Sequence, residues 1–130
     1  MGFPGIPGIS TGGHGIEMTA LDAARFGYLF LRSGDWNGKQ IIPKLWVDES
    51  SKIQSEGHMW FGRYGYQWWI NTVTKDNKNH NMFFAMGYGG QYIFVIPDFD
   101  LVVIFISWMP GEDSFRPMRY LQSYIIKAMQ

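Results

Sequence analysis

Residues 82–97 read MFFAMGYGGQYIFVIP and contain two apolar runs with the composition of β-strands. The four residues Gly87-Tyr88-Gly89-Gly90 separate these runs. A tight hairpin favours Asn-Gly or Asp-Gly at its tip, so three glycines and a tyrosine are a poor spacer. Because glycine has no Cβ atom, it lets the backbone approach another group closely. The stretch therefore predicts a sheet in which the backbone at the start of one strand lacks side chains, so that another group can approach it closely.

The composition indicates one folded domain with an aromatic core. The chain has 130 residues, of which 46% are hydrophobic and 18% aromatic, and this length is enough to bury a single core. Eleven basic residues balance eleven acidic ones, so no charge excess points to nucleic acid or an anionic membrane as a partner. The absence of cysteine excludes disulfides and thiolate metal sites.

Membrane insertion and export leave no signal in this sequence. The longest apolar run, residues 101–109, is far shorter than the ~20 residues that a membrane-spanning helix needs. No basic segment followed by an apolar one marks a signal peptide at the N-terminus. We therefore expect no membrane span, and the compartment stays open.

Local signals predict a Gly-rich loop over residues 1–18 and a helical region over residues 19–53. Thr19 and Asp22 resemble a capping box at the start of a helix that Gly34 ends as a left-handed cap. The Asn-Gly pair within residues 35–40 favours a small hairpin. Pro43 suits the first turn of a short helix that follows.

The second half predicts an antiparallel sheet over residues 64–107 and a helix over residues 114–129. The expected strands cover residues 64–72, 82–86, 91–96 and 101–107, and a polar loop covers residues 75–81. Ser114 is the expected cap of the last helix, with Pro117 in its first turn. The fold class is α+β: an antiparallel sheet of about three to four strands, covered by the C-terminal helix, with two N-terminal helices. The strands lack clean alternation, which indicates cover on both faces.

Three stretches resemble the serine β-lactamase and penicillin-binding-protein superfamily, in particular its class C-like and esterase-like members. They are residues 10–27, with STGGHGIEMT followed by Asp22 and Arg25; residues 36–50, with WNGKQIIP; and residues 64–69 (YGYQWW) together with Gly87-Tyr88-Gly89-Gly90. The resemblance covers nearly the whole chain, in the order expected for the C-terminal part of such an enzyme. It implies residues 1–130 as one portion of a serine hydrolase domain, in a family whose members are often periplasmic or exported.

Such enzymes carry a Ser-x-x-Lys with the nucleophile, a Tyr-x-Asn or Ser-x-Asn, and a Lys-Thr-Gly on an inner strand. No serine of this chain has lysine three residues later, and no tyrosine has asparagine two residues later. Only the third element has a counterpart, in which Tyr88-Gly89-Gly90 replaces Lys-Thr-Gly. The missing lysine removes a cation that would pair with a substrate carboxylate, so specificity for β-lactams is in doubt.

The resemblance assigns substrate binding to Tyr88, Gly89, Gly90 and Gln91. Glycines at 89 and 90 would let an acyl group approach the main chain, and the N–H of Gln91 would be the strand's half of an oxyanion hole. The other half would come from the absent serine. We expect no catalytic side chain, no metal and no cofactor in this chain.

Plainer interpretations stand beside these. Residues 87–90 on their own fit a bulged or wide strand connection with no ligand. Tyr88 fits a ligand-facing position and an aromatic packed at a strand entrance equally well. His14, His58 and His80 are scattered, which favours surface positions over a metal site. The aromatic residues around Trp60, Trp68 and Trp69 fit a core better than a stacking platform.

Two functions follow. In the first, the chain is the C-terminal fragment of a serine hydrolase acting on an amide, ester or lactam, with a small-molecule or peptide-like acyl substrate, and is inactive alone. In the alternative, it is a non-catalytic binding or self-assembling module derived from that fold. An open sheet edge at residues 101–107 would then pair with a second copy.

Overall fold

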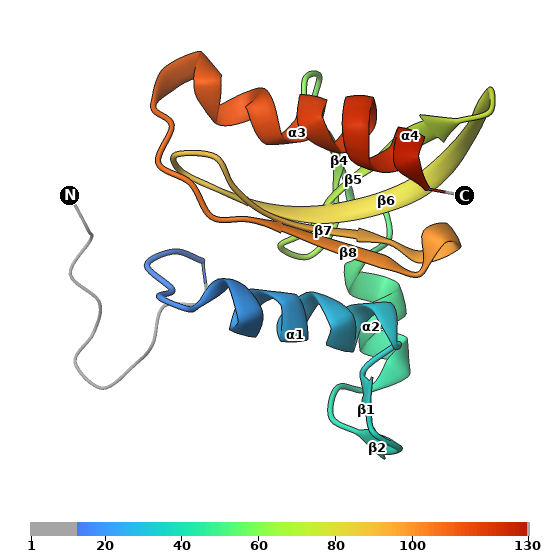
Figure 1. Cartoon of the computed structure of the whole chain (residues 1–130). Coiled ribbons are helices and arrows are strands. Elements are labelled where there is room, and N and C mark those ends of the chain that lie inside the picture. Colours follow the sequence, from blue (N-terminus) through green and yellow to red (C-terminus); the bar gives the residue numbers. More distant parts are fainter. Residues whose placement is uncertain (1–12, 130) are drawn as a thin grey trace.

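The computed structural model describes residues 13–129 and consists of three layers (Figure 1). An antiparallel sheet lies between helix α1 (Ala20–Leu31) and the C-terminal helical segment. Within the described residues the sheet has six strands, and their spatial order follows their order in the chain: β3 (Ser55–His58), β4 (Gly62–Tyr64), β5 (Trp69–Lys75), β6 (Lys78–Gly87), β7 (Gln91–Ile96) and β8 (Leu101–Phe105). The α+β class is as expected, but three to four strands was too few.

Helix α1 begins as its sequence predicts. Thr19 is the N-cap, and its hydroxyl accepts a hydrogen bond from the Asp22 N–H at 3.1 Å. The helix ends one residue earlier than the glycine signal indicates, because Ser33 already has a left-handed φ of 54° and Gly34 follows at 84°. The Gly34 N–H donates to the Leu29 carbonyl at 2.8 Å, which closes the helix end. Of the predicted N-terminal loop, residues 1–12 lie outside the described residues.

The elements after α1 confirm the turn chemistry. Strands β1 (Asp35–Trp36) and β2 (Lys39–Gln40) form the small hairpin around Asn37-Gly38, whose φ angles are 52° and 82°. Helix α2 (Lys44–Ser50) follows, and Pro43 is its N-cap rather than its first helical residue.

The sheet begins before residue 64, and residues 64–72 are not one strand. Residues 55–64 form the edge hairpin β3–β4, in a region for which the sequence predicts no strand before residue 64. The predicted strand is then interrupted between β4 and β5, where Gln67 has a left-handed φ of 66° and Trp68 is buried. Aromatic composition alone could not locate this break, because a buried aromatic suits a strand and a packed turn equally well.

The predicted polar loop over residues 75–81 is also wrong. Strands β5 and β6 continue through it and are joined by only two residues, Asp76 and Asn77, with φ angles of 50° and 59°. These left-handed angles are those of a tight hairpin turn, which asparagine and aspartate tolerate. The polar residues around the turn belong to the exposed ends of two strands that extend beyond the core.

The C-terminal helix is less regular than expected. A 3-10 turn (Gly111–Phe115) leads into α3 (Arg116–Tyr120), a π-helical turn (Leu121–Ile125) and α4 (Ile126–Ala128). Ser114 does not cap α3, because it lies within the 3-10 turn and its hydroxyl donates to the Gly111 carbonyl. Pro117 occupies the first turn of α3, as predicted.

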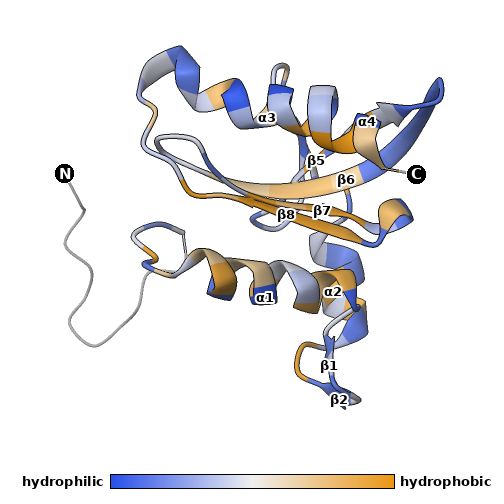
Figure 2. Ribbon diagram, in the orientation of Figure 1, coloured by the Kyte–Doolittle hydropathy of each residue, from blue (hydrophilic) through white to orange (hydrophobic). Residues whose placement is uncertain are grey.

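Both faces of the sheet are covered, and β7 contributes to both cores. Tyr92, Phe94 and Ile96 pack under the C-terminal helix with Leu121 and Ile126. Ile93 and Val95 point to the other face, toward a second core that holds Phe30, Val47, Trp68 and Phe83. Figure 2 shows this hydrophobic band along β7 and β8 between the helices. No helix in residues 13–129 is long and apolar enough to cross a membrane.

Helix α1 packs against the sheet at a glycine. A Cβ atom on Gly27 would lie 2.8 Å from Val102 Cγ1 and 2.9 Å from Ile93 Cγ2, which is closer than side chains pack. The missing side chain lets the helix lie directly on β7 and β8. The helix and the sheet are therefore fixed at a separation that only a glycine allows at this position.

We expect Gly27→Leu to lower the free energy of unfolding by about 1–3 kcal/mol, because it forces apart a packed helix and sheet. Urea unfolding measures this. Tyr28→Leu is the matched control, since it places the same side chain at the next, exposed position and should cost less than about 1 kcal/mol. Equal effects of the two substitutions would contradict the close helix–sheet contact.

Candidate functional site

The glycine-rich stretch is the tip of the hairpin between β6 and β7. Gly87 pairs with Gln91 as the last pair of the ladder, so Tyr88, Gly89 and Gly90 form a three-residue loop. The stretch is therefore a working hairpin connection, contrary to the expectation from its composition. Gly89 and Gly90 have φ angles of 80° and 83°, which glycine adopts without steric cost. This conformation takes the place of the usual Asn-Gly tip.

The backbone at the loop makes close contacts with the same chain. A Cβ atom on Gly90 would lie 2.8 Å from Ser107 Oγ, and one on Gly89 would lie 3.2 Å from the Trp108 ring. Both glycines are buried against the segment that follows β8. Contacts within the chain thus account for both glycines, as the plainer interpretation of a wide strand connection supposes. The substrate role of the loop stays a prediction.

Ser107 holds the loop in one orientation. Its hydroxyl donates to the carbonyl oxygens of Gly89, at 3.0 Å, and Gly90, while the Met109 N–H also donates to the Gly89 carbonyl at 2.8 Å. In a trans peptide the N–H points opposite to the carbonyl of the same unit. The N–H groups of Gly90 and Gln91 therefore point away from residues 107–109. Neither of these two N–H groups is used to hold the loop to that segment.

An open cavity of about 270 Å³ lies beside the loop. Of the four residues assigned to substrate binding, Tyr88 and Gly89 line it, whereas Gly90 and Gln91 do not. Gln91 is exposed at the start of β7. Tyr88 is 75% exposed and meets the Trp108 ring edge-on at 5.4 Å, so it combines a surface position with a ring contact. The remaining lining residues are Phe61, Met86, Gly87, Tyr92, Gly111, Ser114 and Phe115.

The cavity lining carries no charged side chain and one buried phenol. Burial raises the pKa of Tyr92 above the usual value of 10.0, and its hydroxyl donates to the Ser114 carbonyl at 3.1 Å. A phenol with a raised pKa stays protonated at neutral pH, so Tyr92 cannot serve there as a general base. The cavity therefore suits an uncharged group and offers no proton acceptor of this kind.

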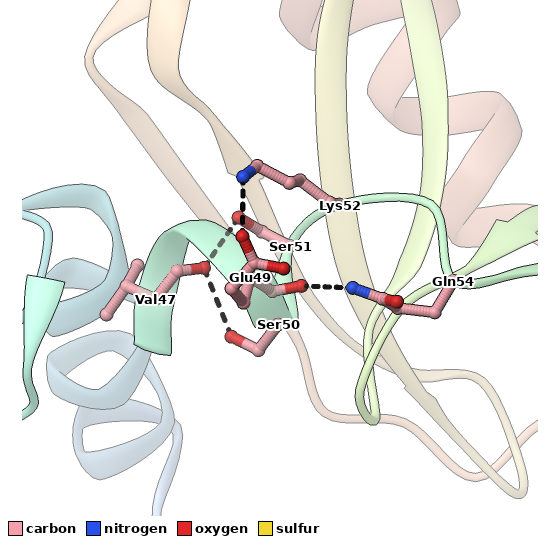
Figure 3. Close-up of polar contacts among 6 residues, drawn as sticks. All are labelled: Val47, Glu49, Ser50, Ser51, Lys52 and Gln54. Carbon is pink, nitrogen blue, oxygen red and sulfur yellow. Dashed lines mark hydrogen bonds and ion pairs between the residues drawn. The ribbon is translucent and has the colours of Figure 1, made fainter. Parts of the chain in front are cut away.

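The two serines nearest in sequence to a lysine are Ser50, at the end of α2, and Ser51, which follows the helix, and neither forms a catalytic pair with Lys52 (Figure 3). Ser50 and Ser51 both donate to the Val47 carbonyl, at 3.1 and 2.8 Å, which caps the end of the helix. The Lys52 ammonium lies 2.7 Å from Glu49 instead, and this carboxylate raises the pKa of Lys52. A lysine that acts as a base needs a lowered pKa, so this cluster is structural.

The other sequence candidates do not assemble into a site. Among residues 13–129, no group of three His, Asp or Glu side chains could hold a metal ion. Trp68 and Trp69 point to opposite faces of the sheet, the first into the core under α1 and the second toward the core under the C-terminal helix. A single stacking platform over both rings is therefore excluded, and the core interpretation is the better one for this pair.

Sequence reasoning missed the residues that lie far from the glycine stretch in sequence but next to the hairpin tip in the fold. Phe61 comes from the edge hairpin and Phe115 from the 3-10 turn, and their rings lie 5.4 Å apart. Ser107, which orients the loop, gave no signal in the sequence beyond its place at the end of a strand. Only the spatial neighbourhood of the hairpin tip identifies these three.

Comparison with known proteins gives matches among solved structures. No protein-family profile matches the sequence. No curated protein sequence matches it either. A solved structure from Bacillus anthracis, provisionally named as a 6-aminohexanoate-dimer hydrolase, is similar with a TM-score of 0.57 and 30% sequence identity over 78% of this chain. The chain spans only 27% of that protein's length. The match confirms, for part of the fold, the resemblance drawn from the sequence motifs.

Replacing Gly90 tests the packing of the loop. Gly90→Ala should lower the free energy of unfolding by at least about 2 kcal/mol, because a left-handed φ is combined with a clash against Ser107. Gly38→Ala is the matched control: Gly38 has a φ of 82° but nothing within 4 Å of a Cβ atom. It should cost only about 1 kcal/mol. Chemical denaturation measures the free energy of unfolding of both variants. An equal loss in the two variants would contradict the close contact of Gly90 with Ser107.

The raised pKa of Tyr92 predicts a pH dependence. The folded protein holds the phenol proton more tightly than the unfolded chain does, so this contribution to stability is complete below pH 10 and is lost as the pH rises above it. Tyr92→Phe should be less stable by about 1 kcal/mol near neutrality, through loss of a hydrogen bond. The difference from the parent chain should shrink above pH 10. Denaturation of both proteins from neutral pH to above pH 10 measures this difference in stability. A difference that does not change with pH would contradict the prediction.

Proposed function

We propose that this chain, which has part of the fold of the serine β-lactamase and penicillin-binding-protein superfamily, is the C-terminal portion of a serine hydrolase domain. Its reaction would be acyl transfer from an amide, ester or lactam to a serine located on polypeptide outside residues 1–130. The single observation that carries the proposal is the glycine hairpin tip. The Ser107 hydroxyl bonds to the carbonyls of Gly89 and Gly90 and so holds both on one side of the tip. An open cavity lies next to the tip.

The role of the loop in this proposal is to stabilise the oxyanion. A tetrahedral intermediate needs N–H donors at fixed positions, and each donor contributes roughly 3 kcal/mol in the transition state. The Gln91 N–H is the proposed donor, because the orientation of the preceding carbonyl turns it away from residues 107–109. Ser107 would then be a positioning residue, since it fixes the peptide unit that carries the donor.

The cavity supports an uncharged acyl or leaving group. Aromatic rings of Phe61, Tyr92 and Phe115 line it, and no lysine or arginine is present in its lining to pair with a carboxylate. The similar protein from Bacillus anthracis is provisionally named as a hydrolase of a 6-aminohexanoate dimer. A neutral portion of an amide or ester is therefore the favoured occupant of the cavity beside Tyr88 and Gly89.

We expect the isolated chain to be inactive. A fluorophosphonate probe should give no covalent labelling, and a chromogenic cephalosporin should not be turned over, because no Ser-x-x-Lys is present. Mass spectrometry and absorbance measure these outcomes. Stoichiometric labelling or turnover would contradict the assignment of the nucleophile to other polypeptide.

A second experiment tests the proposal on the polypeptide encoded upstream of Met1. We expect a Ser-x-x-Lys followed by Tyr-x-Asn or Ser-x-Asn in that upstream sequence, and labelling of its serine once the two parts are joined. An upstream sequence without these motifs would overturn the hydrolase assignment. The second function, a non-catalytic binding or self-assembling module, would then be favoured, because residues 13–129 already contain two hydrophobic cores.

A further inference from the structure

The C-terminal helical segment, from the 3-10 turn to α4, has a π-helical turn in its middle. Leu121 and Ile126 are both buried in the core between this segment and the sheet. In an α-helix, neighbours on one face are three or four positions apart, so residues five apart point in different directions. The π turn at Leu121–Ile125 adds one residue to the turn, and both side chains can then face the sheet. Single π turns of this kind are frequent at functional sites.

Gln122 lies on this turn and binds the backbone of β5. Its side-chain carbonyl accepts a hydrogen bond from the Thr74 N–H at 2.9 Å, and its amide nitrogen donates to the Thr74 carbonyl at 2.7 Å. Strand β4 pairs with β5 only through Trp69 and Ile70, so it does not extend to Thr74. Gln122 therefore makes the two backbone hydrogen bonds that a longer neighbouring strand would make.

Directional bonds between the segment and the sheet are few. Four apolar side chains of the segment pack into the core: Met118, Leu121, Ile125 and Ile126. Apolar contacts are non-directional, so they hold the segment against the sheet more firmly than they fix its position along its own axis. Among the described residues, hydrogen bonds join the segment to the sheet at three places: Ser114 near its start, Gln122 in its middle and Met129 at its end.

The start of the same segment forms one wall of the cavity at the hairpin tip. Gly111, Ser114 and Phe115 line the cavity there. Within the described part of the chain, one hydrogen bond joins this wall to the sheet, from the Tyr92 hydroxyl to the Ser114 carbonyl. The Phe61 and Phe115 rings also meet at the wall, with their centres 5.4 Å apart. With so few contacts of its own, the wall depends on the helix behind it for its position.

We propose that Gln122 is a positioning residue, which sets the distance between this wall and the hairpin tip although it does not line the cavity. The 3-10 turn continues directly into α3 and the π turn, so no loop separates Phe115 from Gln122. Coupling between distant positions is carried by rigid, packed elements of this kind. The inference rests on the proposed function in one respect, because that function places a neutral part of the substrate in the cavity. Gln122 would then determine the fit of the substrate from outside the site.

Gln122→Met tests this role in the isolated chain. Methionine keeps the length and the helix propensity of glutamine but cannot donate to the Thr74 carbonyl and accepts only weakly. In NMR spectra, the nuclear Overhauser effect between the Phe61 and Phe115 rings should be lost. Lys75→Met is the matched control, because it removes the bond at the very end of the segment and should leave the ring contact intact. Equal loss in both variants, or no loss in either, would overturn the proposal.

Gln122→Glu provides a second measurement if Gln122→Met fails to fold, which circular dichroism would reveal. Above a pKa of about 4.3, the glutamate carboxylate can accept from the Thr74 N–H but cannot donate to the Thr74 carbonyl. The protonated acid offers one donor and one acceptor, as the pairing with Thr74 requires. The Phe61–Phe115 contact should therefore be absent at pH 7 and return below pH 4, whereas the parent chain should keep it at both. A contact in this variant that is insensitive to pH would overturn the proposal.

These measurements separate the positioning role from the proposed reaction, because none of them needs the nucleophile. An upstream sequence without Ser-x-x-Lys would overturn the hydrolase assignment and leave the ring contact as it is. A Phe61–Phe115 contact that does not respond to either substitution at Gln122 would overturn the positioning role alone.

Discussion

The position of β7 between two hydrophobic cores is the constraint on which the rest of the structure depends. Its side chains alternate between the core under the C-terminal helix and the core under α1, so a shift by one residue would exchange the two sets. Phe94, Val95 and Ile96 are fully buried, and burying each such side chain contributes roughly 1.5–3 kcal/mol. The register of β7 therefore fixes the positions of both helical layers.

The candidate site follows from this register. Because β7 is held on both faces, the loop that precedes it can be placed accurately at its end, and Ser107 fixes the orientation of the loop from the neighbouring strand. A loop on a rigid strand is the arrangement that electrostatic catalysis requires, since its donors must be in place before the reaction.

Sequence signals predicted the features that depend on a few neighbouring residues. Thr19 and the Asn37-Gly38 turn were recognised because their chemistry acts within three or four positions. The edge hairpin β3–β4 was missed because its short exposed strands have no periodic pattern, and the Asp76-Asn77 turn was hidden in a polar run. The cavity was out of reach, since Phe61 and Phe115 meet only in the folded chain. The tip glycines were noticed, but their contacts with Ser107 and Trp108 were not foreseen.

Amide hydrogen exchange at Gln91 tests the central claim most directly, because the claim is that this N–H is oriented by the loop and free to donate to a substrate. Exchange can be followed residue by residue in the folded chain and compared with that of the fully buried Phe94 on the same strand. We expect rapid exchange at Gln91 and strong protection at Phe94. Protection of Gln91 as strong as that of Phe94 would mean that its N–H is already bonded within the sheet, and would contradict the account.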